Sequence, residues 1–225
     1  MNQRENSYKK NSLNILSLYT KNKKARFLDL GCDDGKWTIE MAKKIGTKNI
    51  YGMELIKETA KIAEERGIKV AIGDLNKELP FANEMFDVVH ANQVIEHLNN
   101  TDLFLDEIYR IIKPNGYAII STENLASWHN IGALILGYMP FSLTNISSKK
   151  AAVGNPFAPH EGKPASKEAS WQHQRIFTIY GLKRLGELSG FKSEEILTSG
   201  YYPLGNFMSK IDPRHSHFFV IKFRK

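Results

Sequence analysis

The sequence predicts a single α/β domain built around a mainly parallel sheet. Three observations support this prediction: strand and helix patterns alternate after residue 25, one apolar strand runs directly into a glycine-bearing turn and a helix, and 42% of the residues are apolar while 24% are charged. Alternating strands and helices imply parallel strands joined by right-handed crossovers. A length of 225 residues suits one such domain with room for an inserted segment.

About seven strands are expected where short apolar or alternating runs lie between turn residues. They cover residues 25–30, 49–53, 68–72, 86–91, 117–121, 196–198 and 218–223. Helices are expected at residues 35–45, 57–66, 101–112 and 178–189. Gly67 and Gly190 follow two of these helices, where a left-handed cap is favoured. Thr101 and Asp102 are capping candidates at the start of a third helix.

A long connection, residues 122–177, separates the fifth strand from the helix that follows it. A loop of that length without secondary structure is uncommon inside a compact domain. Residues 125–136 are therefore expected to form a helix, and residues 145–169, which contain three prolines, a mobile loop. The predicted organisation is a basic N-terminal segment at residues 1–24 and one domain at residues 25–225, with residues 122–177 as a substrate lid.

The net charge of +7 is concentrated at the two ends of the chain. Residues 1–26 carry seven Lys and Arg against one Glu, and residues 210–225 carry five against one Asp. We interpret these ends as solvated segments that aid solubility. Attraction to nucleic acid or to an anionic membrane surface is the alternative.

The composition also bears on location. The longest strongly apolar stretch, residues 131–143, is shorter than the roughly 20 residues of a membrane span, so no span is predicted. The first ten residues are polar, which argues against a secretion signal. The single cysteine, Cys32, excludes an intramolecular disulfide. These features predict a cytoplasmic protein.

The strongest functional pattern is a buried strand followed by a glycine turn, Phe27-Leu28-Asp29-Leu30-Gly31-Cys32-Asp33-Asp34-Gly35. Glycines let the backbone approach a ligand closely, and the N-terminus of the following helix offers unpaired N–H groups. Glu54 ends the second strand about 20 residues later, where doubly wound folds place a carboxylate on ribose hydroxyls. The turn and Glu54 together predict a ligand that contains a nucleoside.

The composition of the turn distinguishes between two nucleoside cofactors. A dinucleotide site has the pattern G-x-G-x-x-G, in which a glycine and the helix N-terminus meet a pyrophosphate. Here Asp33 and Asp34 come soon after Gly31, and two carboxylates would repel a pyrophosphate. They would tolerate a cationic sulfonium that also carries an ammonium group. The turn therefore favours S-adenosylmethionine over NAD.

Through most of residues 25–121 the chain resembles the class I S-adenosylmethionine-dependent methyltransferases, in particular their small-molecule branch. The turn is similar to the family's first motif, D-x-G-x-G-x-G, with Asp33 in place of the middle glycine; Asp tolerates unusual backbone angles better than most residues. Further similar segments follow in the family's order at residues 73–75, 86–92, 94–98 and 105–120. The resemblance implies a Rossmann-like, doubly wound sheet in the order 3-2-1-4-5-7-6, with the last strand antiparallel.

The resemblance also implies cofactor contacts. The turn would border the methionine portion, Glu54 would hold the ribose, the segment around Asp74 would meet the adenine, and the loop after the fourth strand would hold the amino group. The implied cofactor-binding residues are Asp29, Gly31, Cys32, Asp33, Gly35, Glu54, Leu55, Asp74, Leu75, Asn92 and Gln93. Cys32 has no evident basic partner, so we interpret it as a packing residue rather than a nucleophile.

Methyl transfer requires an acceptor held in line with the sulfonium, and a base only when that acceptor is protonated. His173 and Arg175 would share one face of an extended segment, so His173 is preferred as the base and Arg175 as an anion anchor. His97 is the rival base, although it also suits a role in holding its own loop. Weaker acceptor-pocket candidates are Trp128, His129, His160, Tyr201 and Tyr202. No metal site is predicted, because His215-x-His217 alone is insufficient.

The predicted function is methyl transfer to a small molecule, with an oxygen acceptor favoured because a histidine is available as base. A sugar, a glycan precursor, a quinone-like molecule and a lipid intermediate remain open as acceptors. An RNA methyltransferase is the first alternative, but residues 91–94 lack the N/D-P-P-Y/F pattern of base-amine methyltransferases, and no aromatic-rich basic stripe is present. A non-catalytic protein of the same fold and a nicotinamide oxidoreductase are the others. The oligomeric state is left open.

Overall fold

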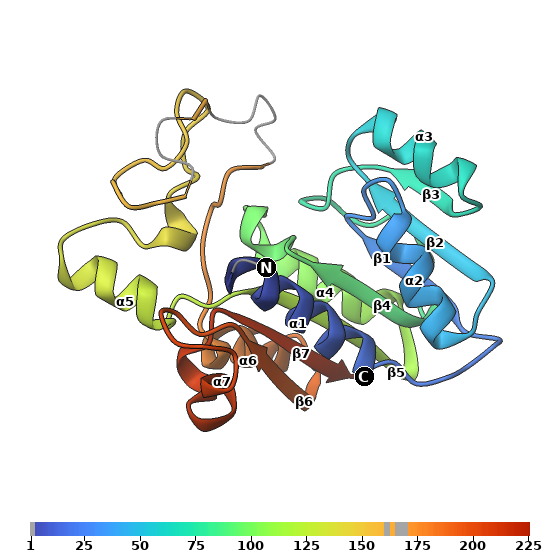
Figure 1. Ribbon diagram of the computed structural model, residues 1–225. Coiled ribbons are helices and arrows are strands. Elements are labelled where there is room, and N and C mark those ends of the chain that lie inside the picture. The colour runs from blue at the N-terminus through green and yellow to red at the C-terminus, as the bar shows by residue number, and fades with distance from the viewer. Residues whose placement is uncertain (1–2, 160–162, 165–170) are drawn as a thin grey trace.

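The computed structural model describes residues 3–159, 163–164 and 171–225. Its centre is a sheet with the strand order β3-β2-β1-β4-β5-β7-β6 (Figure 1). The strands are β1 (Arg26–Leu30), β2 (Asn49–Glu54), β3 (Lys69–Ile72), β4 (Phe86–Asn92), β5 (Ile112–Glu123), β6 (Lys192–Ser199) and β7 (Phe218–Arg224). The first five are mutually parallel, and β7 is antiparallel to both of its neighbours. The predicted fold class and strand order are confirmed.

Helices cover both faces of the sheet. They are α1 (Gln3–Ser17), α2 (Lys36–Ile45), α3 (Lys57–Glu65), α4 (Thr101–Ile111), α5 (Trp128–Ile135), α6 (Ile179–Leu188) and α7 (Met208–Ile211), with 3-10 helices at η1 (Ile95–His97), η2 (Phe141–Leu143) and η4 (Pro213–His215). Leu28 and Leu30 of β1 pack with α4 and α6, whereas Phe27 packs with α1 and α2. This alternation follows from the two-residue period of a strand.

Several details of the elements differ from expectation; β5, for example, begins at Ile112, five residues before its predicted start. The cap of α4 is Asn100, whose side chain accepts a hydrogen bond from the Leu103 N–H (3.1 Å), rather than Thr101 or Asp102. Strand β6 begins at Lys192, four residues before the predicted start, because this edge strand is partly exposed and its first half is polar. Only the second half of this strand therefore has the apolar residues from which a strand is predicted.

Helix α1 is the largest difference from expectation, because no helix was predicted before residue 25. Its Ile15 is buried in the core, and two buried polar side chains bond to the sheet. Asn11 Nδ2 donates to Ser121 Oγ of β5 (3.0 Å), and Asn14 Nδ2 donates to the Thr198 carbonyl of β6 (2.9 Å). The interpretation of this segment as solvated is wrong, because its buried face has helical spacing but is partly polar and gives no apolar periodicity.

The inserted segment contributes α5 and η2 to one side of the molecule, beyond β5 and far from α3 (Figure 1). The predicted helix at residues 125–136 is present as α5, which begins three residues later. In the described part of the chain, no helix combines the length and the apolar character that a membrane crossing requires.

Replacing Ile15 by Ala tests whether α1 belongs to the folded core. Ile15 is 1% exposed, so its truncation should lower the free energy of unfolding by about 2 to 5 kcal/mol. Leu13→Ala is the matched control, because Leu13 lies on the same helix but is 53% exposed, and its cost should stay within about 0.5 kcal/mol. Urea denaturation followed by circular dichroism measures both. Equal losses in the two variants would contradict the packing of α1.

Candidate active site

The turn after β1 has the backbone geometry that its glycines permit. Gly31, Asp33 and Gly35 have positive φ angles of 75°, 47° and 76°. A Cβ atom on Gly31 would lie 2.7 Å from Val94 Cγ2, and one on Gly35 would lie 2.4 Å from Ile68 Cδ1. Both glycines are therefore required by conformation and by space, and Asp33 adopts the left-handed region that Asp tolerates.

Glu54, at the carboxyl end of β2, is held against this turn. Its Oε2 accepts a hydrogen bond from the Asp33 N–H (2.9 Å), and its Oε1 accepts from the N–H groups of Leu55 (2.9 Å) and Ile56 (3.0 Å). A carboxylate has about four acceptor positions, so Glu54 retains capacity for a further donor such as a ribose hydroxyl. Backbone N–H groups thus orient the carboxylate beside the glycine turn.

A cavity of about 300 Å³ lies at the carboxyl ends of β1 and β4. Its lining consists of Ser12, Asp29, Gly31, Cys32, Asp33, Asp34, Trp37, His90 and Asn92. Asp29 is buried and accepts a hydrogen bond from Thr38 Oγ1 (2.5 Å), and burial raises the pKa of Asp29 to about 8. Burial lowers the pKa of the neighbouring His90 to about 3.

This acidic cavity suits a cationic ligand. Three of its lining side chains are carboxyl groups, and the Asn92 Oδ1 atom is buried without a hydrogen-bond partner among the described residues. A buried acceptor of this kind requires a donor, and the ammonium group of an amino acid supplies one. The lining therefore fits the methionine portion of S-adenosylmethionine and would repel a pyrophosphate.

Other predicted cofactor residues lie around this cavity or apart from it. Burial raises the pKa of the Cys32 thiol, and a Cβ on Gly52 would lie 2.6 Å from its sulfur, which agrees with a packing role. Asp74 Oδ1 accepts a hydrogen bond from the Asn76 N–H (2.9 Å), and Leu75 packs against the core, but neither lines the cavity. Their contact with adenine stays a prediction.

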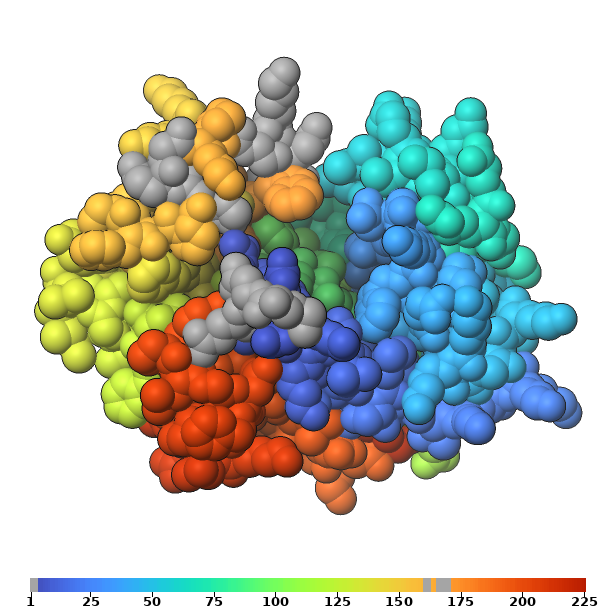
Figure 2. Space-filling view, viewed as in Figure 1, coloured from blue at the N-terminus to red at the C-terminus, as the bar shows by residue number. Residues whose placement is uncertain are grey.

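A second, larger cavity of about 640 Å³ lies under the inserted segment. Its wall includes Arg4, Tyr8, Gln93, Glu96, His97, Glu123, His129, Phe141, Ser142, Thr144, Asn145, Ala151, Ala152, Phe157, Pro159, Lys163, Pro164, Trp171, His173, Tyr202 and His217. The space-filling view shows a hollow between the blue N-terminal helix and the orange end of the insert, with green residues deeper inside (Figure 2). The predicted candidates His97, His129, His173 and Tyr202 thus share one cavity, and His160 lies outside the described residues.

Two consecutive residues at the end of β4 line the two different cavities. Asn92 lines the acidic cavity, and Gln93, the next residue, lines the larger one. Gln93 has a φ of 55°, and its N–H donates to the Ser121 carbonyl of β5 (2.8 Å). Adjacent residues on one turn thus face two different spaces.

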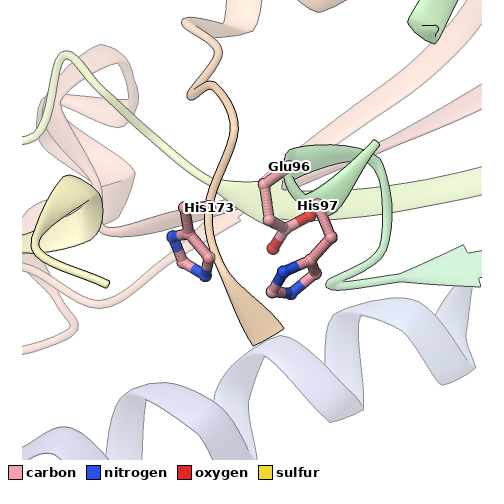
Figure 3. A group of neighbouring side chains, drawn as sticks. All are labelled: Glu96, His97 and His173. Carbon is pink, nitrogen blue, oxygen red and sulfur yellow. The ribbon is translucent and has the colours of Figure 1, made fainter. Parts of the chain in front are cut away.

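Glu96, His97 and His173 form a compact group in the wall of the larger cavity (Figure 3). The rings of His97 and His173 meet edge to face with centroids 4.7 Å apart. His97 Nδ1 lies 3.1 Å from the Gln172 carbonyl oxygen, and His173 Nδ1 lies 2.6 Å from that of Ser142. Because a carbonyl oxygen only accepts, each Nδ1 carries the proton and each Nε2 keeps its lone pair.

Burial shifts the pKa values of two members of this group, Glu96 and His97. Burial away from water raises the pKa of Glu96 to about 8, and the Thr122 hydroxyl and the backbone of Glu96 offset this effect only in part. Burial, followed by the neighbouring His173, lowers the pKa of His97 to about 4. The group is thus assembled at the cost of removing polar atoms from water.

A second group, Glu123, His129 and His217, lines the same cavity. His217 Nε2 lies 3.7 Å from Glu123 Oε1, and the rings of His129 and His217 have centroids 4.6 Å apart. Burial alone would raise the pKa of Glu123, but the adjacent His217 outweighs it and lowers the pKa to about 2. Glu123 is therefore a fixed negative charge in the wall.

Three predicted acceptor residues lie outside the described lining of this cavity. Trp128 Nε1 and the Tyr201 hydroxyl both donate to Asp212 Oδ2, at 2.9 Å and 2.6 Å. Arg175 Nη2 donates to the Asn99 carbonyl (2.7 Å), so it holds the start of α4 rather than an anion in the cavity. Contact of these three residues with an acceptor stays a prediction, and their observed partners are ones that sequence spacing does not reveal.

Sequence reasoning also missed residues that the structure brings to the cavities. Glu96 lies beside the predicted His97, while Glu123 ends β5 and His217 immediately precedes the neighbouring strand β7. Arg4 and Tyr8 come from α1, which was not predicted. The one local signal was the adjacent pair Glu96-His97, because the other residues approach only through the sheet order.

Fold and site together define a class I S-adenosylmethionine-dependent methyltransferase: a 3-2-1-4-5-7-6 sheet, a glycine turn, a carboxylate after β2 and an acidic cavity at the strand ends. A family model described as a methyltransferase domain matches residues 2–196. The chain therefore belongs to the methyltransferase domain family.

Individual relatives agree with this assignment. The ubiquinone biosynthesis O-methyltransferase of Rickettsia canadensis is 34% identical over 140 residues, which are 59% of each chain. The demethylmenaquinone methyltransferase of Staphylococcus carnosus is 26% identical over 183 residues, 77% of this chain and 70% of that protein. The chain spans 59%, 44% and 31% of the length of the first three relatives.

Solved structures share the fold. A methyltransferase of Thermotoga maritima, described as a possible histamine N-methyltransferase, has a TM-score of 0.65 at 20% identity and covers 98% of this chain and 90% of its own. A methyltransferase of Mesorhizobium loti has a TM-score of 0.62 at 16% identity and covers 95% and 96%. At such identities the likeness concerns the fold.

The role of Glu54 can be measured by cofactor binding. Glu54→Ala removes the carboxylate beside the turn and should weaken binding of S-adenosylmethionine and S-adenosylhomocysteine by at least about tenfold, which is about 1.4 kcal/mol. Glu65→Ala is the control, because Glu65 is an exposed residue at the end of α3, and its affinity should match that of the native protein. Isothermal titration calorimetry with both ligands and with NAD measures these affinities. Unchanged affinity in Glu54→Ala would remove Glu54 from the cofactor site.

Proposed function

We propose that this chain transfers a methyl group from S-adenosylmethionine to a hydroxyl oxygen of a small, largely apolar molecule. One observation carries the proposal: consecutive residues Asn92 and Gln93 line the acidic cavity and the histidine-bearing cavity. Molecules held in these two spaces would meet at one loop. Bound S-adenosylmethionine supplies a methyl group on a positively charged sulfur, which is open to in-line attack.

The walls of the larger cavity favour an acceptor with an aromatic or otherwise apolar body. Phe141, Phe157 and Trp171 line it, and such rings bury apolar surface and pack against other rings. Two relatives are named for ubiquinone biosynthesis and for demethylmenaquinone, both of which concern quinones. A phenolic acceptor with an apolar substituent is therefore the class that we propose.

His173 is the proton acceptor in this proposal. Its Nδ1 proton is bound by the Ser142 carbonyl, so the Nε2 lone pair is available to a hydroxyl in the cavity. A phenol has a pKa of about 10 and gives up its proton more readily than an alcohol does. A neutral imidazole is suited to that transfer near neutral pH. His97, which has the same tautomer, is the second candidate.

The acceptor class is tested with S-adenosylmethionine that carries a labelled methyl group. The panel contains phenols with and without apolar substituents, aliphatic alcohols, aromatic amines and a structured RNA. We expect labelled product from the phenols, and most from those with an apolar substituent. If the label enters only the amines or the RNA, the proposal of hydroxyl methylation is wrong, although the chain still binds S-adenosylmethionine.

The His173→Ala variant tests the proton acceptor. Loss of a positioned base should lower kcat by about 10² to 10⁴-fold and leave the Kd for S-adenosylmethionine unchanged. His215→Ala is the control, because His215 bonds to Asp212 and lies outside the described lining of both cavities. The kcat of the His173→Ala and His215→Ala variants is measured over a range of pH. A His173→Ala enzyme as fast as the control would exclude this role.

A further inference from the structure

The group Glu96, His97 and His173 has the composition of a metal site. The two histidines and the carboxylate each offer one ligand atom, and these atoms all lie within 4.8 Å of one another. In Figure 3 the three side chains converge from two segments, η1 and the end of the insert. The sequence predicted no metal site, because His173 is remote from the other two in the chain.

Both histidines are oriented as metal ligands usually are. A coordinating imidazole binds through one nitrogen and donates the N–H of the other to a carbonyl or carboxylate, which fixes its tautomer. His97 and His173 each direct Nδ1 to a backbone carbonyl, of Gln172 and Ser142 respectively. Their Nε2 atoms are therefore the ones available to an ion, and the carbonyl contacts that orient the two rings are already in place.

Glu96 supplies an independent indication of a ligand. Its side chain is 1% exposed, and neither carboxylate oxygen makes a hydrogen bond of normal length and angle within the described residues, although the nearby Thr122 hydroxyl lowers its pKa slightly. A buried carboxylate without a partner is costly, and such groups are ordinarily neutralised by a proton, a counter-charge or a metal ion. The residue lines the larger cavity, so an ion has access to it.

We propose that Glu96 and the Nε2 atoms of His97 and His173 bind one divalent transition-metal ion in the wall of the larger cavity. Two imidazoles and one carboxylate are borderline ligands that favour Zn²⁺, Co²⁺ or Mn²⁺ over Mg²⁺. Ligand atoms about 2.1 Å from one ion are at most about 4.2 Å apart, so the group needs only a small closure to bind it.

Glu123 favours this arrangement through charge. One carboxylate and two neutral imidazoles leave a bound divalent ion with an uncompensated positive charge. Glu123 faces the same cavity and its negative charge acts on Glu96, so it offsets that charge without serving as a ligand. The alternative group around Glu123 is a weaker candidate, because His217 already pairs with this carboxylate at 3.7 Å.

This inference rests on the proposed function where it concerns the acceptor. Three protein ligands leave open positions on the ion, and a hydroxyl of the acceptor would occupy one of them. The ion would make that hydroxyl more acidic, so the hydroxyl proton would pass to water. The hydroxyl oxygen would then form the new bond to the methyl carbon, and the electron pair of the broken carbon–sulfur bond would stay on sulfur. His173 would then act as a metal ligand rather than as the base.

Direct metal binding tests the site independently of activity. Tag-free protein is stripped with a chelator, desalted and titrated calorimetrically with Zn²⁺, Mn²⁺ and Mg²⁺, and Co²⁺ binding is followed by visible absorption. We expect one ion per chain, with Zn²⁺ bound more tightly than Mn²⁺ and Mg²⁺ weakest. Bound ion should also raise the Tm of the native protein, because it stabilises the folded state.

Two variants and one control make the outcome specific to these residues. Glu96→Gln, which keeps the side-chain shape, and His97→Ala should each weaken Zn²⁺ binding by at least about tenfold and change the Co²⁺ spectrum. His215→Ala should bind as the native protein does. Binding of S-adenosylmethionine to the stripped protein and to each variant confirms that the fold and the cofactor site persist.

Each result has one meaning. If the native protein binds none of the ions, or if both variants bind Zn²⁺ as tightly as the control, the metal site is refuted even though S-adenosylmethionine binds. If the ion binds at this site but no hydroxyl acceptor is methylated, the metal site stands and the proposed function fails. If label is transferred equally well with and without chelator, the proposed role of the ion in transfer is overturned.

Discussion

The close approach of the turn after β1 to the loop after β4 is the constraint on which both cavities depend. Gly31 brings the two segments together at a distance where a Cβ atom would lie 2.7 Å from Val94 Cγ2. The loop then directs Asn92 into the acidic cavity and Gln93 into the larger one. A larger residue than glycine at position 31 would strain the backbone and force the Val94 side chain to shift.

Each cavity contains a buried carboxyl group whose pKa is raised. Asp29 in the acidic cavity and Glu96 in the larger one both have pKa values raised to about 8, because their surroundings exclude water. Such groups lower the stability of the protein on their own. A cationic ligand in each cavity would stabilise the ionised carboxylate, which gives a shared physical reason for a sulfonium in one and a metal ion in the other.

Helix α1 and the insert, which are far apart in the sequence, complete the site. Ser12 of α1 lines the acidic cavity, while Arg4 and Tyr8 line the larger one, so a single helix borders both. The insert contributes much of the remaining wall of the larger cavity, including Phe141 and His173. The central strands position the cofactor side, and these two additions shape the acceptor side.

The sequence by itself determined the α/β class, because apolar periodicity is encoded by neighbouring residues, and its resemblance to a known family implied the sheet order and the cofactor; the turn from Gly31 to Gly35 and the acid at Glu54 are local patterns of the same kind. Only the tertiary structure decided the rest. It revealed α1, whose buried face is partly polar, and it joined His173 to Glu96 and His97 across a long insert. The direction of a side chain in an irregular segment depends on distant partners, which a local pattern does not contain.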